Sequence, residues 1–69
     1  MKYVRVRSYH NGKYTGCDHL YLGNNQVEAL ARFRKEYPEH DECILIAEYF
    51  DSEEHKELFT AFLNCGFVH

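Results

Sequence analysis

The most apolar stretch of the chain covers residues 43–50. Its letters, CILIAEYF, are rich in β-branched and aromatic types, and charged residues stand on both sides of it. A short apolar run of this kind predicts a buried strand. Because alternate side chains of a strand point to opposite faces, one face would carry Ile44, Ile46 and Phe50 and the other Cys43, Leu45, Ala47 and Tyr49. A strand that is apolar on both faces needs cover on both, and we expect the rest of the chain to be arranged around it.

The first residues of the chain alternate between apolar and polar positions and predict a different strand. Val4 and Val6 share one face, while an aromatic and basic set shares the other: Tyr3, Arg5, Arg7 and Tyr9. The dipeptide Asn11-Gly12 follows, and it is the strongest short signal of a tight hairpin, because both residues tolerate the positive φ of a type I′ turn. The return strand is predicted over residues 14–22.

A tight turn at Asn-Gly fixes the register of this hairpin. Tyr9 would lie opposite Tyr14, and Arg5 opposite Asp18. Arg5 and Asp18 would then form an ion pair across the strands. A bulge near Gly16 would shift the register by one residue.

A first helix is predicted over residues 26–37. An Asn of the preceding Gly23-Asn24-Asn25 segment caps its start, and Pro38 ends it. Apolar residues recur at helical spacing and form the stripe expected to face the core: Val27, Leu30, Phe33 and Tyr37.

A second helix is predicted to begin at Asp51 and to end near Cys65. Asp51 with Glu54 three residues later fits a capping box. Its apolar stripe consists of Leu58, Phe59, Phe62 and Leu63. Gly66 suits the position after the helix end, and the apolar pair Phe67-Val68 is expected to fold back onto the helix.

These elements predict an α+β fold of order β-β-α-β-α. A right-handed crossover puts the first strand in the middle of a small three-stranded antiparallel-type sheet, in the spatial order 2-1-3, with two helices. The simplest packing places both helices on the face of Val4 and Val6. The opposite face would then display Tyr3, Tyr9, Tyr14 and Leu20, together with one set of side chains from residues 43–50. The alternative places one helix on each face and buries both.

The composition narrows the function classes. A chain of 69 residues is expected to form a single compact domain over residues 1–69, and 45% apolar residues exclude a disordered chain. The net charge of −3 argues against unspecific binding to nucleic acid or to an anionic membrane. No secretory signal and no apolar run of about 18–20 residues is visible, so we expect a cytoplasmic protein without a membrane partner. Three cysteines without framework spacing are expected to stay reduced.

The aromatic and basic sheet face is the main candidate site. It would combine six partner-binding residues: Tyr3, Arg5, Arg7, Tyr9, Lys13 and Tyr14. Tyr and Arg are typical anchors of protein interfaces, including homodimers. The same residue types bind single-stranded RNA or DNA in other sheets, and they also occur on ordinary solvated faces. The acidic net charge favours the protein interface over nucleic acid.

Two further sets of residues suggest weaker sites. Cys17, His19, Cys65 and His69 would form a zinc site if the chain end reached the second strand, although none of them has the paired spacing of typical zinc ligands. All three cysteines also fit the interpretation of small buried core residues. The acidic residues Asp51, Glu53, Glu54 and Glu57 would dock onto a basic partner, or they are simply the solvated start of a helix.

No motif supports catalysis or a cofactor. Pairing of a cysteine with His19, His55 or His69, oriented by Asp18, has no short motif behind it, and a domain of this size has little room for a pocket. We therefore expect a small non-enzymatic interaction module, such as an accessory regulator or inhibitor of a larger protein in a bacterium or a mobile element. A small single-stranded RNA- or DNA-binding protein is the alternative, and a zinc-stabilised binding module the third.

Overall fold

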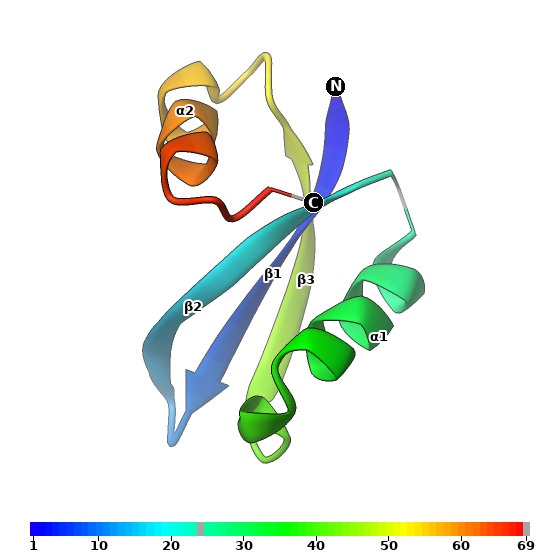
Figure 1. Ribbon diagram of the computed structural model, residues 1–69, viewed down its shortest axis with the longest axis vertical. Helices are drawn as coiled ribbons and strands as arrows, with labels where there is room; N and C mark the ends of the chain where they lie inside the picture. The colour runs from blue at the N-terminus through cyan, green and yellow to red at the C-terminus, as the bar shows by residue number, and fades with distance from the viewer. Residues whose placement is uncertain (24, 69) are drawn as a thin grey trace.

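The structure is a computed structural model that describes residues 1–23 and 25–68. Its elements follow the predicted order: β1 (Lys2–His10), β2 (Lys13–Leu22), α1 (Gln26–Glu36), the short 3₁₀ helix η1 (Pro38–His40), β3 (Ile44–Asp51) and α2 (Lys56–Asn64). Within the described residues, the three strands form one sheet of order β2-β1-β3 in which both pairings are antiparallel (Figure 1). The α+β class and the strand order predicted from the sequence are therefore confirmed.

The middle strand β1 contributes to two separate cores. Its Val4 and Val6 are buried with Phe33 and Ala29 of α1 and with Tyr21 of β2. On the other face, its Tyr3 is buried in a second cluster, which also contains Leu20, Phe50 and Phe62. Because β1 is paired along both edges and covered on both faces, it is the strand around which the molecule is built.

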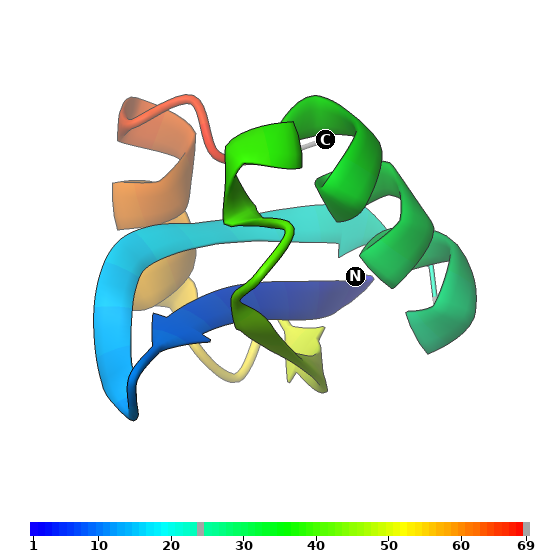
Figure 2. The same ribbon diagram turned by 90° about the horizontal axis from the view of Figure 1, so that it is seen from below.

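The two helices pack on opposite faces of the sheet. Ribbon views in two directions separate α1 from α2 (Figure 1 and Figure 2), and the two cores place α1 on the face of Val4 and α2 on the face of Tyr3. The expectation that both helices share the Val4 face is therefore wrong, and the alternative with one helix on each face is correct. The physical reason is that Tyr3, Leu20 and Phe50 make one end of the second face apolar, and Phe62 of α2 covers them. Tyr3 and Leu20 are thus buried and not displayed.

β3 is an edge strand, and the expectation of a buried strand at residues 43–50 is wrong. β3 pairs with β1 on one side, and Ile44, at 67% exposure, and Tyr49 are open to solvent. The apolar pattern tells which side chains a strand is able to bury, but burial also requires a neighbouring strand and a covering layer. In the described chain, β1 has a neighbouring strand on both sides, whereas β3 has one on a single side, and β1 is also covered more completely than β3.

The hairpin between β1 and β2 forms as predicted, with one change of register. Asn11 and Gly12 both have positive φ, 53° and 78°, as a type I′ turn requires, and Tyr9 lies opposite Tyr14. A bulge that includes Gly16 then shifts the register by two residues, where one was predicted, so that Asp18 lies opposite Arg7. The predicted ion pair of Asp18 with Arg5 nevertheless forms, on the diagonal.

The start of α1 is capped as the sequence predicts. The side-chain Oδ1 of Asn25 accepts a hydrogen bond from the backbone N–H of Glu28 at 3.0 Å. Phe33 is buried as predicted, but Val27 is exposed, and Ala29 takes its place in the core. Ala29 and Phe33 are four residues apart, so they lie one above the other on the helix face that meets the sheet.

The start of α2 differs from the prediction. The helix begins at Lys56, five residues after Asp51, and Asp51 is the last residue of β3. The predicted capping box is therefore wrong: the side chain of Asp51 accepts from the N–H of Glu53 at 2.9 Å and holds Lys2 at 2.9 Å. The Asp51 carboxylate, which the local pattern predicted to cap the helix, instead makes a long-range contact with the N-terminal strand.

The end of α2 and the following tail fold back as predicted. Gly66 has φ 75° and donates to the carbonyl of Leu63, while Phe67 donates to the carbonyl of Phe62 at 2.9 Å, which together form a Schellman motif. The tail then reaches the outer edge of β2, where Leu20 donates to the carbonyl of Phe67 at 2.8 Å and pairs in parallel with Val68. The tail thus covers part of the β2 edge.

In the part of the chain that the structure describes, neither α1 nor α2 has the length and apolar character needed to span a lipid bilayer.

Candidate protein-interaction surface

The sheet face toward α2 consists of rows of side chains that run across the three strands. In order from the β1 start to the hairpin, the rows are Leu22, Tyr3 and Phe50; Leu20, Arg5 and Glu48; Asp18, Arg7 and Ile46; and Tyr14, Tyr9 and Ile44. α2 and the tail pack against the beginning of this face, because Phe62, Phe59, Phe67 and Val68 contact the cluster of Tyr3, Leu20 and Phe50. The last two rows, those of Arg7 and Tyr9, extend beyond the part of the face that α2 and the tail cover.

We call the residues of the last two rows, apart from Asp18, the open face: Arg7, Tyr9, Tyr14, Ile44 and Ile46. Tyr14, Ile44 and Ile46 are among the exposed large apolar side chains, and Tyr9 is half-buried. The rings of Tyr9 and Tyr14 lie side by side with their centroids 5.9 Å apart. The open face therefore presents two aromatic and two aliphatic side chains around a single arginine.

Arg5 does not present its charge to solvent. Its Nε and Nη2 donate to Oδ2 of Asp18 at 3.0 and 2.8 Å, and the two side chains are only 21% and 8% exposed. The guanidinium carbon also lies 5.2 Å from the centroid of the Phe62 ring, in cation–π contact. Arg5 is therefore an internal element that joins β1, β2 and α2.

Arg7 is paired more loosely. Its Nη2 forms an ion pair with Glu48 on β3, and the two side chains are 25% and 50% exposed. Burial opposes the charge of Arg7, but the hydrogen bond and the charge of Glu48 outweigh it and raise its pKa. Among the described residues, no acceptor contacts the buried Nε of Arg7. This N–H donor is buried beneath the open face.

A groove of about 310 Å³ adjoins the open face at Tyr14. It lies between β2 and α2 and is lined by Tyr14, Gly16, Asp18, Leu58, Phe62 and Cys65, with Arg5, Ala61 and Phe67 completing it. Burial, together with the hydrogen bond to Asp18, raises the pKa of Tyr14 to about 12. The phenol is therefore neutral at physiological pH, and the groove offers a largely apolar wall next to the exposed Tyr14 ring.

The predicted partner-binding residues divide into two groups. Arg7, Tyr9 and Tyr14 lie on the open face, and Lys13 is exposed beside it at the hairpin. Tyr3, at 7% exposure, and Arg5 lie beneath α2 and its contacts. Ile44 and Ile46 were not among the predicted partner-binding residues, although one set of side chains from residues 43–50 was expected on this face.

The structure does not bring the predicted zinc ligands together. Cys17 and His19 lie on the sheet face toward α1, whereas Cys65 is exposed at the end of α2, on the opposite side of the sheet. His69 lies outside the described residues. Among those that are described, no three His, Cys, Asp or Glu side chains are grouped so that they could hold a metal ion. The exposure of Cys65 also shows that the core-thiol interpretation is wrong for this cysteine.

A polar cluster beneath α1 and η1 was not predicted. The buried hydroxyl of Ser8 contacts Thr15 Oγ1 and lies 3.0 Å from Nδ1 of His40, and the Cys43 thiol lies 3.6 Å from the same nitrogen. Burial raises the pKa of the nearby Cys17 thiol, which keeps it protonated and a poor nucleophile. The sequence feature that could have predicted this cluster is Ser8, a polar residue that follows Val4 and Val6 on an otherwise apolar strand face. The cluster satisfies buried polar groups between sheet and helix.

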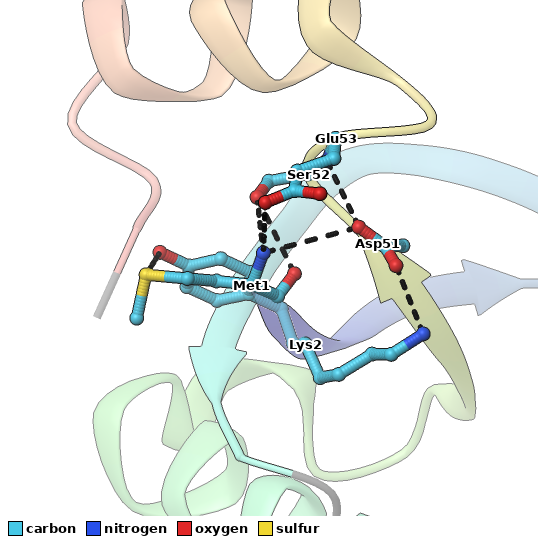
Figure 3. Close-up of polar contacts among 6 residues, drawn as sticks. Met1, Lys2, Asp51, Ser52 and Glu53 are labelled. Atoms are coloured by element: carbon cyan, nitrogen blue, oxygen red, sulfur yellow. Dashed lines mark hydrogen bonds and ion pairs between the residues drawn. The ribbon is translucent and has the colours of Figure 1, made fainter.

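The acidic segment before α2 is partly used within the molecule (Figure 3). The amino group of Met1 lies 3.1 Å from Ser52 Oγ and 3.9 Å from carboxylate oxygens of both Asp51 and Glu53. The hydrogen bond from Lys2, followed by that from the N–H of Glu53, lowers the pKa of Asp51 to about 2. Of the predicted acidic docking residues, Asp51 thus fastens the end of β3 to the start of β1, while Glu53, Glu54 and Glu57 are exposed.

Comparisons with known proteins found no matching family model, no similar curated protein and no similar solved structure. What the protein does must therefore be inferred from its own surfaces. Of these, the open face combines the exposed apolar area and the anchor-type residues.

Proposed function

We propose that the protein is a non-enzymatic interaction module that binds another protein through the open face. The observation that carries this proposal is that Tyr14, Ile44 and Ile46 are exposed together beyond the cover of α2. Contiguous apolar patches on small proteins are typical of interaction sites. Tyr and Arg at such a patch supply the large, well-oriented contacts that dominate binding energy.

The charges around the open face favour a protein partner over nucleic acid. Arg5 is held by Asp18 and Arg7 by Glu48, so these arginines bring their own counter-charges. Nucleic-acid binding depends on cations that neutralise phosphates, and the chain carries a net charge of −3. A protein that offers a complementary apolar surface fits the open face better. A cytoplasmic regulator or inhibitor of a larger protein is the concrete form of this proposal.

The proposal is tested by affinity capture with the purified protein and two variants. Tyr9→Ala/Tyr14→Ala removes both rings from the open face, while Leu63→Ala removes an exposed apolar side chain from α2, outside the open face. We expect one protein to be captured by the wild type and by Leu63→Ala and to be lost with Tyr9→Ala/Tyr14→Ala. Equal capture by all three proteins would refute the open face as the binding site. Thermal melts of both variants check that they are folded.

A direct binding assay with labelled single-stranded RNA and DNA decides the alternative. Binding that weakens steeply with added salt and is lost in Arg7→Ala would establish nucleic acid as the ligand. We expect no binding at physiological salt, because Arg5 and Arg7 are already paired with carboxylates of the same chain.

A further inference from the structure

The groove beside the open face has an apolar wall that comes from one side of α2. Leu58, Ala61 and Cys65 line it at intervals of three and four residues, which places them on the same side of the helix. Tyr14 lines it from β2, and so does Phe67 of the tail, which runs from α2 back to β2 (Figure 1). Leu58 is 40% exposed, and Ala61 and Cys65 are exposed as well, so this wall is accessible from outside.

The charged groups inside the groove already satisfy each other. Oδ2 of Asp18 accepts hydrogen bonds from Nε and Nη2 of Arg5, and the guanidinium of Arg5 lies against the ring of Phe62. A charged group that entered the groove would have to compete with this ion pair. The part of the groove between α2 and β2 therefore suits an apolar side chain.

A second hollow, of about 550 Å³, adjoins the groove at the start of α2. It is lined by residues 53–58, so Leu58 belongs to both. Residues 53–57 hold three carboxylates and one lysine, which gives a formal charge of −2 with His55 neutral. Glu54 and Glu57 are exposed, and within the described residues neither of them forms an ion pair. We call this part the acidic hollow.

The charge of the acidic hollow decides which class of partner the groove fits. Its carboxylates repel the phosphates of nucleic acid and the headgroups of an anionic membrane. They attract lysine and arginine side chains, and charge complementarity of this kind orients a partner on a surface. The accessible path runs from Tyr14 on β2 past Leu58 to Glu54. A path that crosses several elements in this way suits a segment of polypeptide chain.

We propose that the groove and the acidic hollow together bind a basic segment of the partner protein. The segment places a large apolar side chain between α2 and β2 and directs lysine or arginine side chains toward Glu54 and Glu57. An apolar anchor in a groove, flanked by charge, is a common mode of peptide recognition. The inference rests on the proposed function, because it specifies the partner of the same interaction, and Tyr14 belongs to both the open face and the groove.

The first test uses a phage-displayed library of short random peptides, selected on the purified protein. We expect the enriched peptides to share a large apolar residue and two or more lysine or arginine residues. Enrichment of acidic or uncharged peptides, or no enrichment over a support without the protein, would overturn the proposal. The tightest peptide is then synthesised with a fluorescent label, and its Kd is measured by anisotropy.

The second test measures the Kd of the labelled peptide for matched variants. Glu54→Gln/Glu57→Gln removes charge from the acidic hollow, while Glu28→Gln/Glu42→Gln makes the same change in net charge at exposed positions on α1 and before β3. Two exposed ion pairs correspond to about a 2- to 30-fold change in Kd. We expect a loss of this size for the first variant and little change for the second. Equal affinities of the two variants would contradict the role of the acidic hollow.

A substitution in the apolar wall tests the groove itself. Ala61→Arg places a long cationic side chain in the groove, four residues after Glu57, where it both fills the space and pairs with the carboxylate. We expect it to abolish binding of the labelled peptide, whereas Ala61→Ser keeps the groove open and should bind as the native protein does. Unchanged binding by Ala61→Arg would refute the groove as the site. Thermal melts confirm that each variant is folded.

The same variants separate this inference from the proposed function. Tyr9 lies on the open face but does not line the groove. A captured partner that is lost with Tyr9→Ala, but retained by Glu54→Gln/Glu57→Gln and by Ala61→Arg, would leave the proposed function standing and overturn this inference. A partner that is retained by Tyr9→Ala and lost with the other two variants would support the groove and refute the open face.

Discussion

Two ion pairs join the same two adjacent rows of one sheet face, and we predict that they contribute very differently to stability. Arg5–Asp18 lies beside Phe62 of α2, with side chains 21% and 8% exposed, while Arg7–Glu48 lies on the open part of the face at 25% and 50%. Removing one partner of a buried pair leaves an uncompensated charge and costs about 3–5 kcal/mol. An exposed pair contributes about 0.2–1 kcal/mol.

The perturbation that uses this contrast is Asp18→Asn, with Glu48→Gln as its matched control. Asp18 accepts two hydrogen bonds from Arg5, and bonds to charged groups are worth about 1.5–3 kcal/mol each. Asn keeps an acceptor oxygen but loses the charge, so we expect a loss of about 2 kcal/mol in the free energy of unfolding. For a domain of this size, that corresponds to a fall in Tm of about 8–16 °C. Glu48→Gln should cost less than about 1 kcal/mol.

Urea denaturation of two double-mutant cycles measures the pairs directly. One cycle combines Asp18→Asn with Arg5→Met, and the other combines Glu48→Gln with Arg7→Met. We expect a coupling energy of about 2 kcal/mol in the first cycle and below about 1 kcal/mol in the second. Equal coupling energies would refute the reasoning, because they would mean that α2 does not shield Arg5 and Asp18 from water.

Two further predictions concern residues at the ends of secondary-structure elements. The pKa of Asp51 is about 2 in the folded protein and ordinarily 3.8, so its stabilising effect is complete above about pH 4 and is lost as the pH falls toward 2. Denaturant titrations across this window should show a smaller loss of stability for Asp51→Asn than for the wild type. Parallel curves for the two proteins would contradict the role assigned to the Asp51 carboxylate. Asn25→Ala should lower the free energy of unfolding by about 1 kcal/mol because it removes the side-chain cap of α1. His55→Ala, at the start of α2, removes no capping bond but only the contact of its ring with Phe50, and should cost less in the same thermal melts.

The features that the sequence predicted correctly are those determined by local geometry. Asn11 and Gly12 adopt positive φ in the turn, Asn25 caps α1, and Gly66 ends α2 in a Schellman motif. Each depends on the conformational preference of one or two residues. The order of the strands also followed, because a short crossover leaves few topologies available.

The features that were missed depend on contacts between distant parts of the chain. Asp51 has the spacing of a helix cap, but Lys2 and the amino group of Met1 occupy its carboxylate. Ile44 and Ile46 have the pattern of buried strand residues, but they lie beyond the reach of α2. The candidate site changed accordingly: Tyr9 and Tyr14 remained part of it, Tyr3 became core, and the isoleucines joined it.

The position of β1 also has a consequence for how the protein is made. The strand at the centre of the sheet is the first to leave the ribosome, and its pairs with β3 lie between 35 residues (Tyr9 with Ile44) and 49 residues (Lys2 with Asp51) further along the chain. At translation rates of about 5–20 residues per second, β1 waits roughly 2–10 s for the strand that completes it. During that interval both outer edges of the nascent hairpin of β1 and β2 are unpaired, and an unpaired strand edge is a template for association with other chains.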